Sequence, residues 1–239
     1  MPRPISIVVI CHNEESHIRR CIESVLPLSD DILILDSGST DETIAIVKTY
    51  PVRLVQTTWL GYGATKNYGH SLASYGWILS IDADECVDDQ LKESIASCKL
   101  HHEESYIVQR VNLIGERTIK FGHLKPEKKL RLFQKELFEW DHKAVHEQLI
   151  PKTKKIKLQQ LKGSLIHRQA KDISDLKCQY EHYAHLSKKK NRNIILTRLS
   201  PLYHLLRSYI FFGGLLEGRL GLDLAKAAYF YSYKKNLHP

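Results

Sequence analysis

Three carboxylates stand within four residues in the stretch Leu-Ser-Ile-Asp-Ala-Asp-Glu, which covers residues 79–85. Its first three residues are typical of the close of a buried strand. Acidic side chains there are costly, because like charges repel and unpaired carboxylates lose their hydration. A divalent cation at the strand end would remove both costs. The alternative is a helix N-terminus, with Asp84 or Asp88 capping a helix over residues 88–98. The triplet by itself leaves both interpretations open.

A strand–helix rhythm in the first hundred residues indicates which elements must position this triplet. Strands are predicted from apolar runs at residues 5–11, 32–35, 52–56 and 77–81. Apolar spacing predicts helices at residues 18–25 and 64–75, and a third helix is predicted to start with Ser39 or Thr40 as its N-cap. Strands that alternate with helices predict an α/β fold, with a mostly parallel central sheet flanked by helices.

Polar clusters follow three of the predicted strands. His12, Asn13 and Glu14 come directly after the first strand, Asp36 ends the second, and the acidic triplet ends the fourth. In open parallel sheets, ligands bind beyond the carboxyl ends of the strands. We therefore expect the three clusters to converge on one edge of the sheet, a convergence that stability alone does not explain.

The second part of the chain follows a different pattern. Runs at residues 106–113 and 130–134 predict strands in a mixed extension of the sheet. Residues 152–162 form a basic stretch that we expect to be solvated, and residues 172–193 predict a polar helix. The expected organisation is a first domain over residues 1–170 and a helical region over residues 171–239.

Composition and cysteine usage exclude several classes of protein. The 239 residues are 43% hydrophobic and 26% charged, which is typical of a folded chain. The five cysteines are scattered without a C-x-x-C pair, so we expect reduced thiols in a cytoplasmic protein rather than disulfides. The N-terminus runs straight into a predicted strand, so no secretory signal is expected.

Other catalytic motifs are also missing from the sequence. His142 and His146 are four residues apart, but Ile150 stands where a zinc-binding H-E-x-x-H motif needs its second histidine, so catalytic zinc is not expected. The sequence contains neither G-x-x-x-x-G-K-[ST] nor G-x-G-x-x-G, which disfavours P-loop and dinucleotide enzymes.

The charge of the chain is divided unevenly. Residues 1–100 hold 8 Lys and Arg against 14 Asp and Glu, whereas residues 101–239 hold 27 against 13. The basic second half could meet nucleic acid, an anionic membrane surface or a phosphate-bearing substrate. Nucleic acid is disfavoured because the aromatic residues gather in apolar stretches and do not interleave with the lysines as base-stacking platforms would.

The segment at residues 199–233 is rich in leucine and aromatic residues. Its longest uninterrupted apolar piece, residues 209–216, is far shorter than the ~20 residues that a membrane-spanning helix needs. Two interpretations stay open. The helices could close over the protein core, or they could lie on a bilayer with Tyr, Phe and basic residues at the level of the headgroups.

Several motifs together resemble a known family. ISIVVICHNEE, ILDSGSTDET, GYGATKN and ILSIDADE are similar to family 2 glycosyltransferases with a GT-A fold. KLRLF, VHEQL and the tail from Arg207 to Tyr231 resemble the lipopolysaccharide core branch of that family, whose members are often described as glucosyltransferases. The resemblance implies an inverting transfer of a hexose, with glucose favoured, from a nucleotide-diphosphate sugar to a saccharide or lipid-linked acceptor.

The resemblance also implies roles for the acidic residues. Asp84 would bind Mn²⁺ or Mg²⁺, which neutralises the departing diphosphate, and Asp82 would hold the ribose or share the metal. Glu85 is expected to start a helix or to support the site from outside the metal shell. Asp36 would recognise the nucleobase, although capping the turn at residues 37–38 is its alternative role.

Five further residues are carried over for donor binding. His12 stands where the family motif often has Tyr, so its stacking on the base is in question; Asn13 and Glu14 follow it as donor-site residues. Lys66 could pair with the diphosphate or could be an ordinary exposed helix lysine. Arg131 could likewise contact a substrate phosphate or lie on the surface.

The general base is expected on the acceptor side of the site. An inverting transfer needs a carboxylate that takes the proton of the acceptor hydroxyl. Glu147 in VHEQL is the candidate by resemblance, and Asp141 is its nearest competitor. The alternative is that Glu147 only pairs with a neighbouring lysine.

Two other functions compete with sugar transfer. Sugar-1-phosphate nucleotidyltransferases share the fold, but they usually carry a glycine- and arginine-rich loop after the first strand, and CHNEESHIRR contains no glycine. A basic nucleic-acid-binding protein is the second alternative.

We expect a cytoplasmic enzyme that attaches peripherally to the inner face of the membrane.

Overall fold

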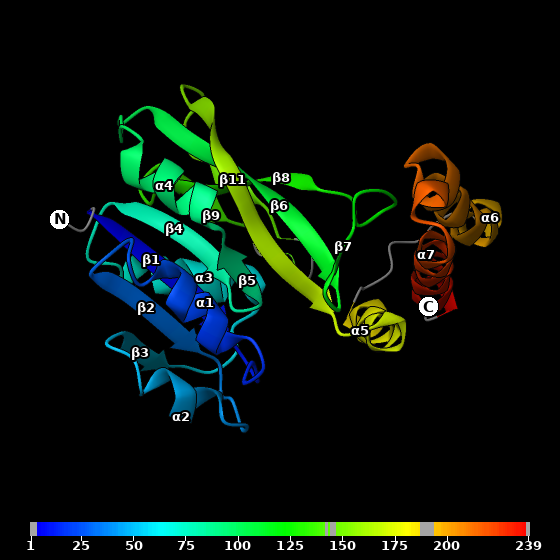
Figure 1. The fold of residues 1–239 in the computed structure, drawn as a ribbon, viewed down its shortest axis with the longest axis horizontal. Helices are drawn as coiled ribbons and strands as arrows, with labels where there is room; N and C mark the ends of the chain where they lie inside the picture. The colour runs from blue at the N-terminus through cyan, green and yellow to red at the C-terminus, as the bar shows by residue number, and fades with distance from the viewer. Residues whose placement is uncertain (1–3, 142, 144–146, 187–193, 238–239) are drawn as a thin grey trace. The chain divides into compact units, whose positions relative to one another are not determined.

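The computed structural model describes residues 4–141, 143, 147–186 and 194–237 (Figure 1). His142 and His146, whose spacing raised the question of zinc, lie outside the described residues, as does Val145 of the VHEQL motif. Glu147 is described.

The central sheet begins with parallel strands in the order β3-β2-β1-β4. These are β1 (Ile5–Cys11), β2 (Asp31–Asp36), β3 (Arg53–Gln56) and β4 (Trp77–Asp82). In this register Cys11 lies beside Asp36, and Ile10 lies beside Asp82. The carboxyl ends of the first, second and fourth strands therefore meet at one edge, as the sequence predicted.

The sheet continues from β4 in the order β8-β6-β11-β5, with β7 paired to β6. The added strands are β5 (Glu85–Val87), β6 (Glu104–Ile114), β7 (Arg117–Thr118), β8 (Glu127–Gln134) and β11 (Lys157–Ala170). The pairings β4–β8, β6–β7 and β5–β11 are antiparallel, so the extension is mixed. A separate hairpin joins β9 (Phe138–Trp140) to β10 (Leu149–Pro151).

Helices cover both faces of the parallel strands. Helices α1 (Ile18–Val25), α2 (Thr43–Val47) and α4 (Asp89–Ser97) pack on the face that carries Ile7 and Val9. Helix α3 (Tyr62–Ser71) lies on the opposite face, where a Cβ on Gly69 would stand 2.8 Å from Val8. The predicted α/β class, with a sheet flanked by helices and a helical C-terminal region, is confirmed. The sheet was expected to be mostly parallel and is mixed, with its parallel pairings in β3-β2-β1-β4.

Two local predictions about helix starts have different outcomes. Asp88 is the N-cap of α4 and accepts a hydrogen bond from the Leu91 amide at 2.7 Å. The prediction that Ser39 or Thr40 caps α2 is wrong, because α2 begins at Thr43. The Ser39 amide and hydroxyl instead donate to Asp36. The turn before α2 is thus held by Asp36 at the end of β2 and not by α2.

The chain divides into two compact units. The first contains residues 1–110 and 128–167, and the second contains residues 111–127 and 168–239. Residues 111–127, which the expected boundary at residue 170 assigns to the first domain, belong to the second unit. The basic stretch at residues 152–162 runs into β11, which begins at Lys157. The side chains at the start of β11 are exposed, as expected for a solvated stretch.

The second unit is mainly helical. It contains α5 (Ile173–Leu186), α6 (Ile194–Leu206), a π-helical turn η1 (Arg207–Phe211), a 3-10 turn η2 (Gly214–Glu217) and α7 (Arg219–Leu237). Its apolar core is formed by Ile114, Ile119, Leu124, Ala170, Leu176, Leu224 and Ala227. Among the described helices, none is both long enough and apolar enough to cross a membrane.

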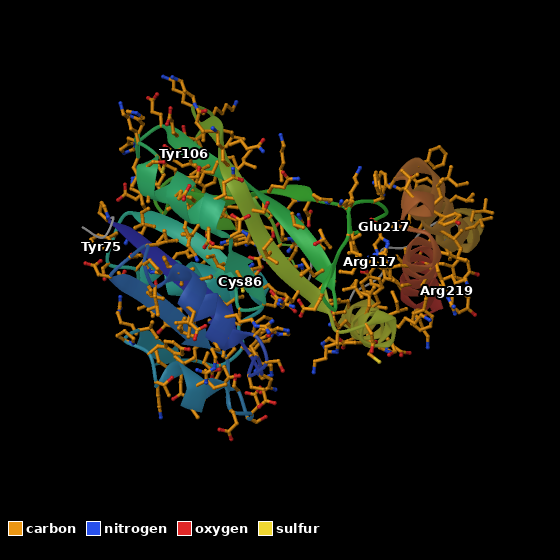
Figure 2. All side chains as sticks on the ribbon, in the orientation of Figure 1. Tyr75, Cys86, Tyr106, Arg117, Glu217 and Arg219 are labelled. Atoms are coloured by element: carbon orange, nitrogen blue, oxygen red, sulfur yellow. The ribbon has the colours of Figure 1, made fainter. Side chains whose placement is uncertain are left out.

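Buried Glu217 joins two segments of the second unit. Its Oε2 lies 2.9 Å from Arg117 Nη2 (Figure 2), and its Oε1 accepts from the amides of Lys120 and Phe121 at 2.8 and 3.2 Å. One carboxylate therefore fixes the segment after β7 against η2, which holds the turn between α6 and α7.

Candidate active site

Asp36 and Asn13 build the loops at the ends of β1 and β2. Asp36 is fully buried, and its Oδ1 accepts from the amides of Gly38 and Ser39, both at 3.0 Å. Asn13 has a φ of 57°, and its Oδ1 accepts from the Thr40 amide at 2.8 Å. Asparagine tolerates this left-handed backbone better than most residues. The two side chains therefore fix the turn at residues 37–40, so the alternative role of Asp36 in holding that turn is present in the structure.

Glu14, in the first loop, lies within electrostatic reach of Asp82 and Asp84. Its amide donates to Thr43 Oγ1 at 2.7 Å, and its carboxylate lies 3.1 Å from His17 Nδ1. Burial and the nearby charges of Asp84 and Asp82 raise the pKa of Glu14 against the lowering effect of His17. His12 is exposed beside this loop.

Asp82, at the end of β4, lies between two buried cations. Its Oδ1 is 2.9 Å from Lys66 Nζ, and its Oδ2 is 2.9 Å from Arg131 Nη2. Burial alone would raise the pKa of Asp82, but the charges of Lys66 and Arg131 outweigh burial and hold that pKa far below its ordinary value. Asp82 is thus an anion with a cation beside each oxygen, and only Oδ2 accepts a hydrogen bond from the described residues.

Lys66 connects Asp82 to Glu147. The lysine is only 3% exposed, and its Nζ lies 2.7 Å from Glu147 Oε1 and 4.5 Å from the centre of the Trp140 ring. Burial lowers the pKa of Lys66, and Asp82 and Glu147 together raise it above its ordinary value. The alternative reading of Lys66 as an exposed helix lysine is wrong.

Helix α3 is clamped to the end of β9, the strand that precedes Glu147. Asn67 donates from Nδ2 to the Trp140 carbonyl at 3.0 Å, and its Oδ1 accepts from the Trp140 amide at 2.9 Å. Gly63 approaches the same segment so closely that a Cβ there would stand 1.9 Å from the Asp141 carbonyl oxygen. In the motif GYGATKN, Gly63 therefore allows close approach to Asp141, Lys66 supplies the buried charge, and Asn67 hydrogen-bonds to the backbone of Trp140.

Glu85 and Arg131 form the buried floor beneath Asp82. Glu85 is fully buried; its Oε1 accepts from Arg131 Nη2 at 2.6 Å, and its Oε2 accepts from the Asp82 amide at 3.1 Å. Arg110 Nη1 lies 3.3 Å from Glu85 Oε1. Of the two alternatives left open for each residue, the helix start for Glu85 and the surface position for Arg131 are wrong, because Glu85 opens β5 and both side chains are buried.

Asp84 pairs with a histidine that sequence reasoning missed. Its Oδ2 lies 3.1 Å from His167 Nε2, on the strand β11 that pairs with β5. Its buried Oδ1 accepts no hydrogen bond from any residue that the structure describes. Burial opposes the charged form of both groups, yet their mutual attraction lowers the pKa of Asp84 and raises the pKa of His167.

The competitor carboxylate Asp141 is engaged locally. Its Oδ2 lies 2.6 Å from Lys143 Nζ, and its Oδ1 accepts from the Gln148 amide at 3.0 Å. These contacts outweigh burial and lower the pKa of Asp141. Asp141 thus closes the loop that leads to Glu147.

The structure brings most of the predicted residues into two adjoining groups. One links Asp82, Lys66, Arg131 and Glu147 through ion pairs, and Asp84 follows Asp82 by two residues. The other comprises Asn13, Glu14 and Asp36 in the loops after β1 and β2. Sequence reasoning missed Arg110, Trp140 and His167. The pairing of β5 with β11 brings His167 to Asp84, and it was not visible in the local pattern.

Comparisons with known proteins agree on one family. The family model Glycosyl transferase family 2 matches residues 6–160. The chain is 34% identical over 161 residues to the lipopolysaccharide core biosynthesis glycosyltransferase LpsC of Rhizobium meliloti, covering 62% of this chain and 57% of that protein. It is also 34% identical over 113 residues to an uncharacterized glycosyltransferase of Rickettsia typhi, covering 47% of this chain and 39% of the relative.

Solved structures of glucosyl-3-phosphoglycerate synthase from Mycobacterium tuberculosis are also similar, with 30% identity and a TM-score of 0.32 over 34% of this chain and 33% of that one. The chain thus spans little more than half, or less, of each of these relatives. The family match, by contrast, extends over more than half of this chain and includes the strands that carry Asp36, Asp82 and Arg131. The chain belongs to glycosyltransferase family 2.

Proposed function

We propose that this chain transfers a hexose, with glucose favoured, from a nucleotide-diphosphate sugar to a saccharide or lipid-linked acceptor, with inversion at the anomeric carbon. The observation that carries the proposal is the buried ammonium of Lys66, which lies 2.9 Å from Asp82 and 2.7 Å from Glu147. It holds a donor-side carboxylate and a candidate general base at a fixed separation, as a single in-line displacement requires.

The residues around Asp84 fit a divalent cation. Asp84 Oδ1 is buried and accepts no bond within the described part of the chain, and His167 Nε2 stands beside the other oxygen. The described residues contain no group of three or more His, Cys, Asp or Glu arranged to hold a metal. Mg²⁺ and similar ions commonly take one or two protein ligands and complete their shell with substrate phosphates and water.

We therefore assign Asp84 and His167 as the residues that would hold the metal, His167 once its Nε2 has lost the proton that the pair with Asp84 now favours. A nitrogen ligand favours Mn²⁺ over the harder Mg²⁺. When bound, the cation would supply Lewis-acid neutralisation of the charge that develops on the departing diphosphate. Asp82 shares the metal less readily than the sequence suggested, because both its oxygens face cations; we assign it to the ribose.

Glu147 is the proposed general base. It would take the proton of the acceptor hydroxyl at Oε2, the oxygen that is not bonded to Lys66, while the hydroxyl oxygen attacks the anomeric carbon. Lys66 fixes the orientation of that carboxylate, and Arg131 does the same for Asp82. These contacts support positioning roles for Lys66 and Arg131 over direct contact with the diphosphate or another substrate phosphate.

The loops after β1 and β2 are proposed to receive the nucleotide. Asp36 is buried with both oxygens engaged by Gly38, Ser39 and Cys11, which supports shaping of the base-binding loop. Asn13 holds the same loop. Exposed His12 is available to stack on the base, and Glu14, which lies within electrostatic reach of Asp82 and Asp84, would contact the donor.

The similarity to LpsC supports an acceptor in lipopolysaccharide core or another cell-envelope glycan. Such an acceptor is lipid-linked, so we propose that the enzyme works in the cytoplasm, peripherally on an anionic membrane surface. The match to glycosyltransferase family 2 disfavours the nucleotidyltransferase alternative and a nucleic-acid-binding role.

The test is product analysis with the purified chain, Mn²⁺, a panel of nucleotide sugars and a membrane extract as acceptor source. We expect UDP-glucose to give a labelled glycolipid whose new linkage has the opposite anomeric configuration to the donor. Transfer with retained configuration, or no transfer from any nucleotide sugar, would contradict the proposal.

A further inference from the structure

Helix α6 and the turns after it present their apolar side chains outward. On the described part of α6 and η1, the exposed large apolar residues are Leu199, Leu202, Tyr203, Leu206, Ile210 and Phe211. These positions recur at helical spacing along one face. Ser200, on the side that meets α7, lies 3.0 Å from Ser232 through its hydroxyl. A surface helix normally shows the reverse pattern, with polar residues facing water.

The apolar face continues over the turn between α6 and α7. Phe211 is 76% exposed. Leu215 and Leu216 follow in η2; both are exposed, Leu216 by 64%. Gly213 and Glu217 fix this turn, the first through a left-handed backbone and the second through its contacts with Arg117 and two amides. The most exposed apolar side chains are therefore held on a rigid turn. Contiguous exposed apolar surface of this kind marks a binding site.

Two cationic side chains lie over the ring of Phe212, the residue that follows η1. Lys125 Nζ stands 4.1 Å and Arg207 Cζ stands 4.6 Å from the centre of the Phe212 ring, and both side chains are exposed. Cations over an aromatic face are held by its quadrupole without losing access to anions. The wider segment 194–237 carries six Lys and Arg against two Asp and Glu. One of these cations is Arg219 at the start of α7 (Figure 2).

We propose that this surface, formed by α6, η1 and η2 with Lys125, docks on an anionic lipid bilayer. Phe211, Leu215 and Leu216 enter the acyl boundary, and Lys125 and Arg207 meet the lipid phosphates. The combination of apolar residues with cations beside them fits an interfacial element. Association with a second copy is disfavoured, because like cationic surfaces repel each other whereas lipid phosphates attract them. The inference deepens the proposed membrane attachment by naming the surface that makes it.

The test is sedimentation of the full chain with vesicles of phosphatidylcholine alone or of equal parts phosphatidylcholine and phosphatidylglycerol. The chain should sediment with the anionic vesicles at low salt and less as salt rises. The double variant Phe211→Ser with Leu216→Ser should bind about ten- to a hundredfold more weakly. The double variant Lys125→Gln with Arg207→Gln should lose roughly thirtyfold and most of its salt dependence. Leu158→Ser, at an exposed leucine of the first unit, is the matched control and should bind normally.

Wild-type protein that stays in solution with both vesicles would overturn the proposal, as would equal binding by wild type and the Phe211/Leu216 variant. Loss of a concentration-dependent dimer in that variant, without vesicle binding by wild type, would assign the surface to self-association and also overturn it. UDP titration in solution separates this inference from sugar transfer. Both surface variants should keep wild-type UDP affinity, so a failure of transfer chemistry would leave the vesicle result standing.

Discussion

Lys66 Nζ lies 2.7 Å from Glu147 Oε1, although 81 residues separate the two in the sequence. The contact forms because Asn67 and Gly63 hold α3 against Trp140 and Asp141, at the end of β9, the strand that precedes Glu147. The same ammonium pairs with Asp82 at the end of β4. One helix thus sets the position of a carboxylate on each side of the proposed reaction centre.

Replacing this ammonium should both destabilise and inactivate the protein. Lys66→Met leaves Asp82 and Glu147 without their shared cation, and removal of one partner from a buried ion pair typically costs about 3–5 kcal/mol. We expect a loss of that order in the free energy of unfolding, measured by urea denaturation. Lys128→Met, at an exposed lysine, should change it by less than about 0.5 kcal/mol. Equal stability of the Lys66 and Lys128 variants would show that the buried pair is not formed in solution.

Gly63 tests the contact between α3 and the loop that leads to Glu147. A Cβ at this position would overlap the Asp141 carbonyl oxygen, so Gly63→Ala must push the loop away. We expect a loss of about 1–3 kcal/mol in stability and a fall in turnover larger than the change in UDP affinity. Gly76→Ala is the matched control, because no heavy atom lies within 4 Å of the added Cβ. Similar stability and turnover in the two variants would contradict this packing.

The sequence predicted the parts of the site that depend on local pattern. The apolar runs located β1, β2 and β4, and the acids at their ends predicted the shared edge. The prediction of Ser39 as an N-cap failed because a serine hydroxyl can either cap a helix or bond to the end of a strand. In the structure it donates to Asp36 at the end of β2. The Ser39 hydroxyl also accepts from the Asn13 amide at 2.8 Å, a contact that depends on the pairing of β1 with β2 and that no local spacing reveals.

Residues brought in by distant pairing could not be predicted. His167 reaches Asp84 across 83 positions because β11 pairs with β5, a three-residue strand whose sequence Glu-Cys-Val carries little strand signal. A lysine on a short helix is usually exposed, so the burial of Lys66 and its stacking on Trp140 also required the tertiary structure. The position of Asp84 at a strand end was predictable from the sequence, but its pairing with His167 was not.

Mn²⁺ should strengthen UDP binding through Asp84 and His167. Calorimetric titration of UDP is expected to show tighter binding with Mn²⁺ than in EDTA. Asp84→Asn and His167→Asn should each reduce that enhancement by at least about tenfold, because each removes a proposed ligand. Asp89→Asn, at an exposed carboxylate of α4, is the control. UDP affinity that is the same with Mn²⁺ and in EDTA would show that the metal takes no part in nucleotide binding.

The second unit should lose stability in mild acid through His123. Its Nδ1 lies 3.0 Å from Ser208 Oγ and its Nε2 lies 2.7 Å from Tyr180 OH, and burial together with the charge of His204 lowers its pKa from 6.5 to about 4. Because the unfolded chain then binds the proton more readily, this contribution is complete above pH ~6.5 and is lost as the pH falls toward 4.

We expect His123→Gln to reduce the fall in unfolding free energy between pH 7 and pH 4.5 by about 2–3 kcal/mol, relative to the wild type. The measurement is urea denaturation at each pH, followed by circular dichroism. His101→Gln, at an exposed histidine, should leave the wild-type pH dependence intact. The same slope in the His123 variant and the wild type would mean that His123 titrates normally in the folded protein.

The central claim is that Glu147 is the general base, and Glu147→Gln tests it most directly. The amide keeps the size of the side chain and an oxygen that can accept from Lys66, but it cannot take the acceptor proton. Turnover of UDP-glucose with a membrane extract should fall roughly 10²- to 10⁴-fold, while UDP affinity stays near that of the wild type. Stability should fall less than in Lys66→Met, because Asp82 still pairs with the Lys66 ammonium. Near-full turnover by Glu147→Gln, with turnover lost in Asp141→Asn, would contradict the account and move the role to Asp141.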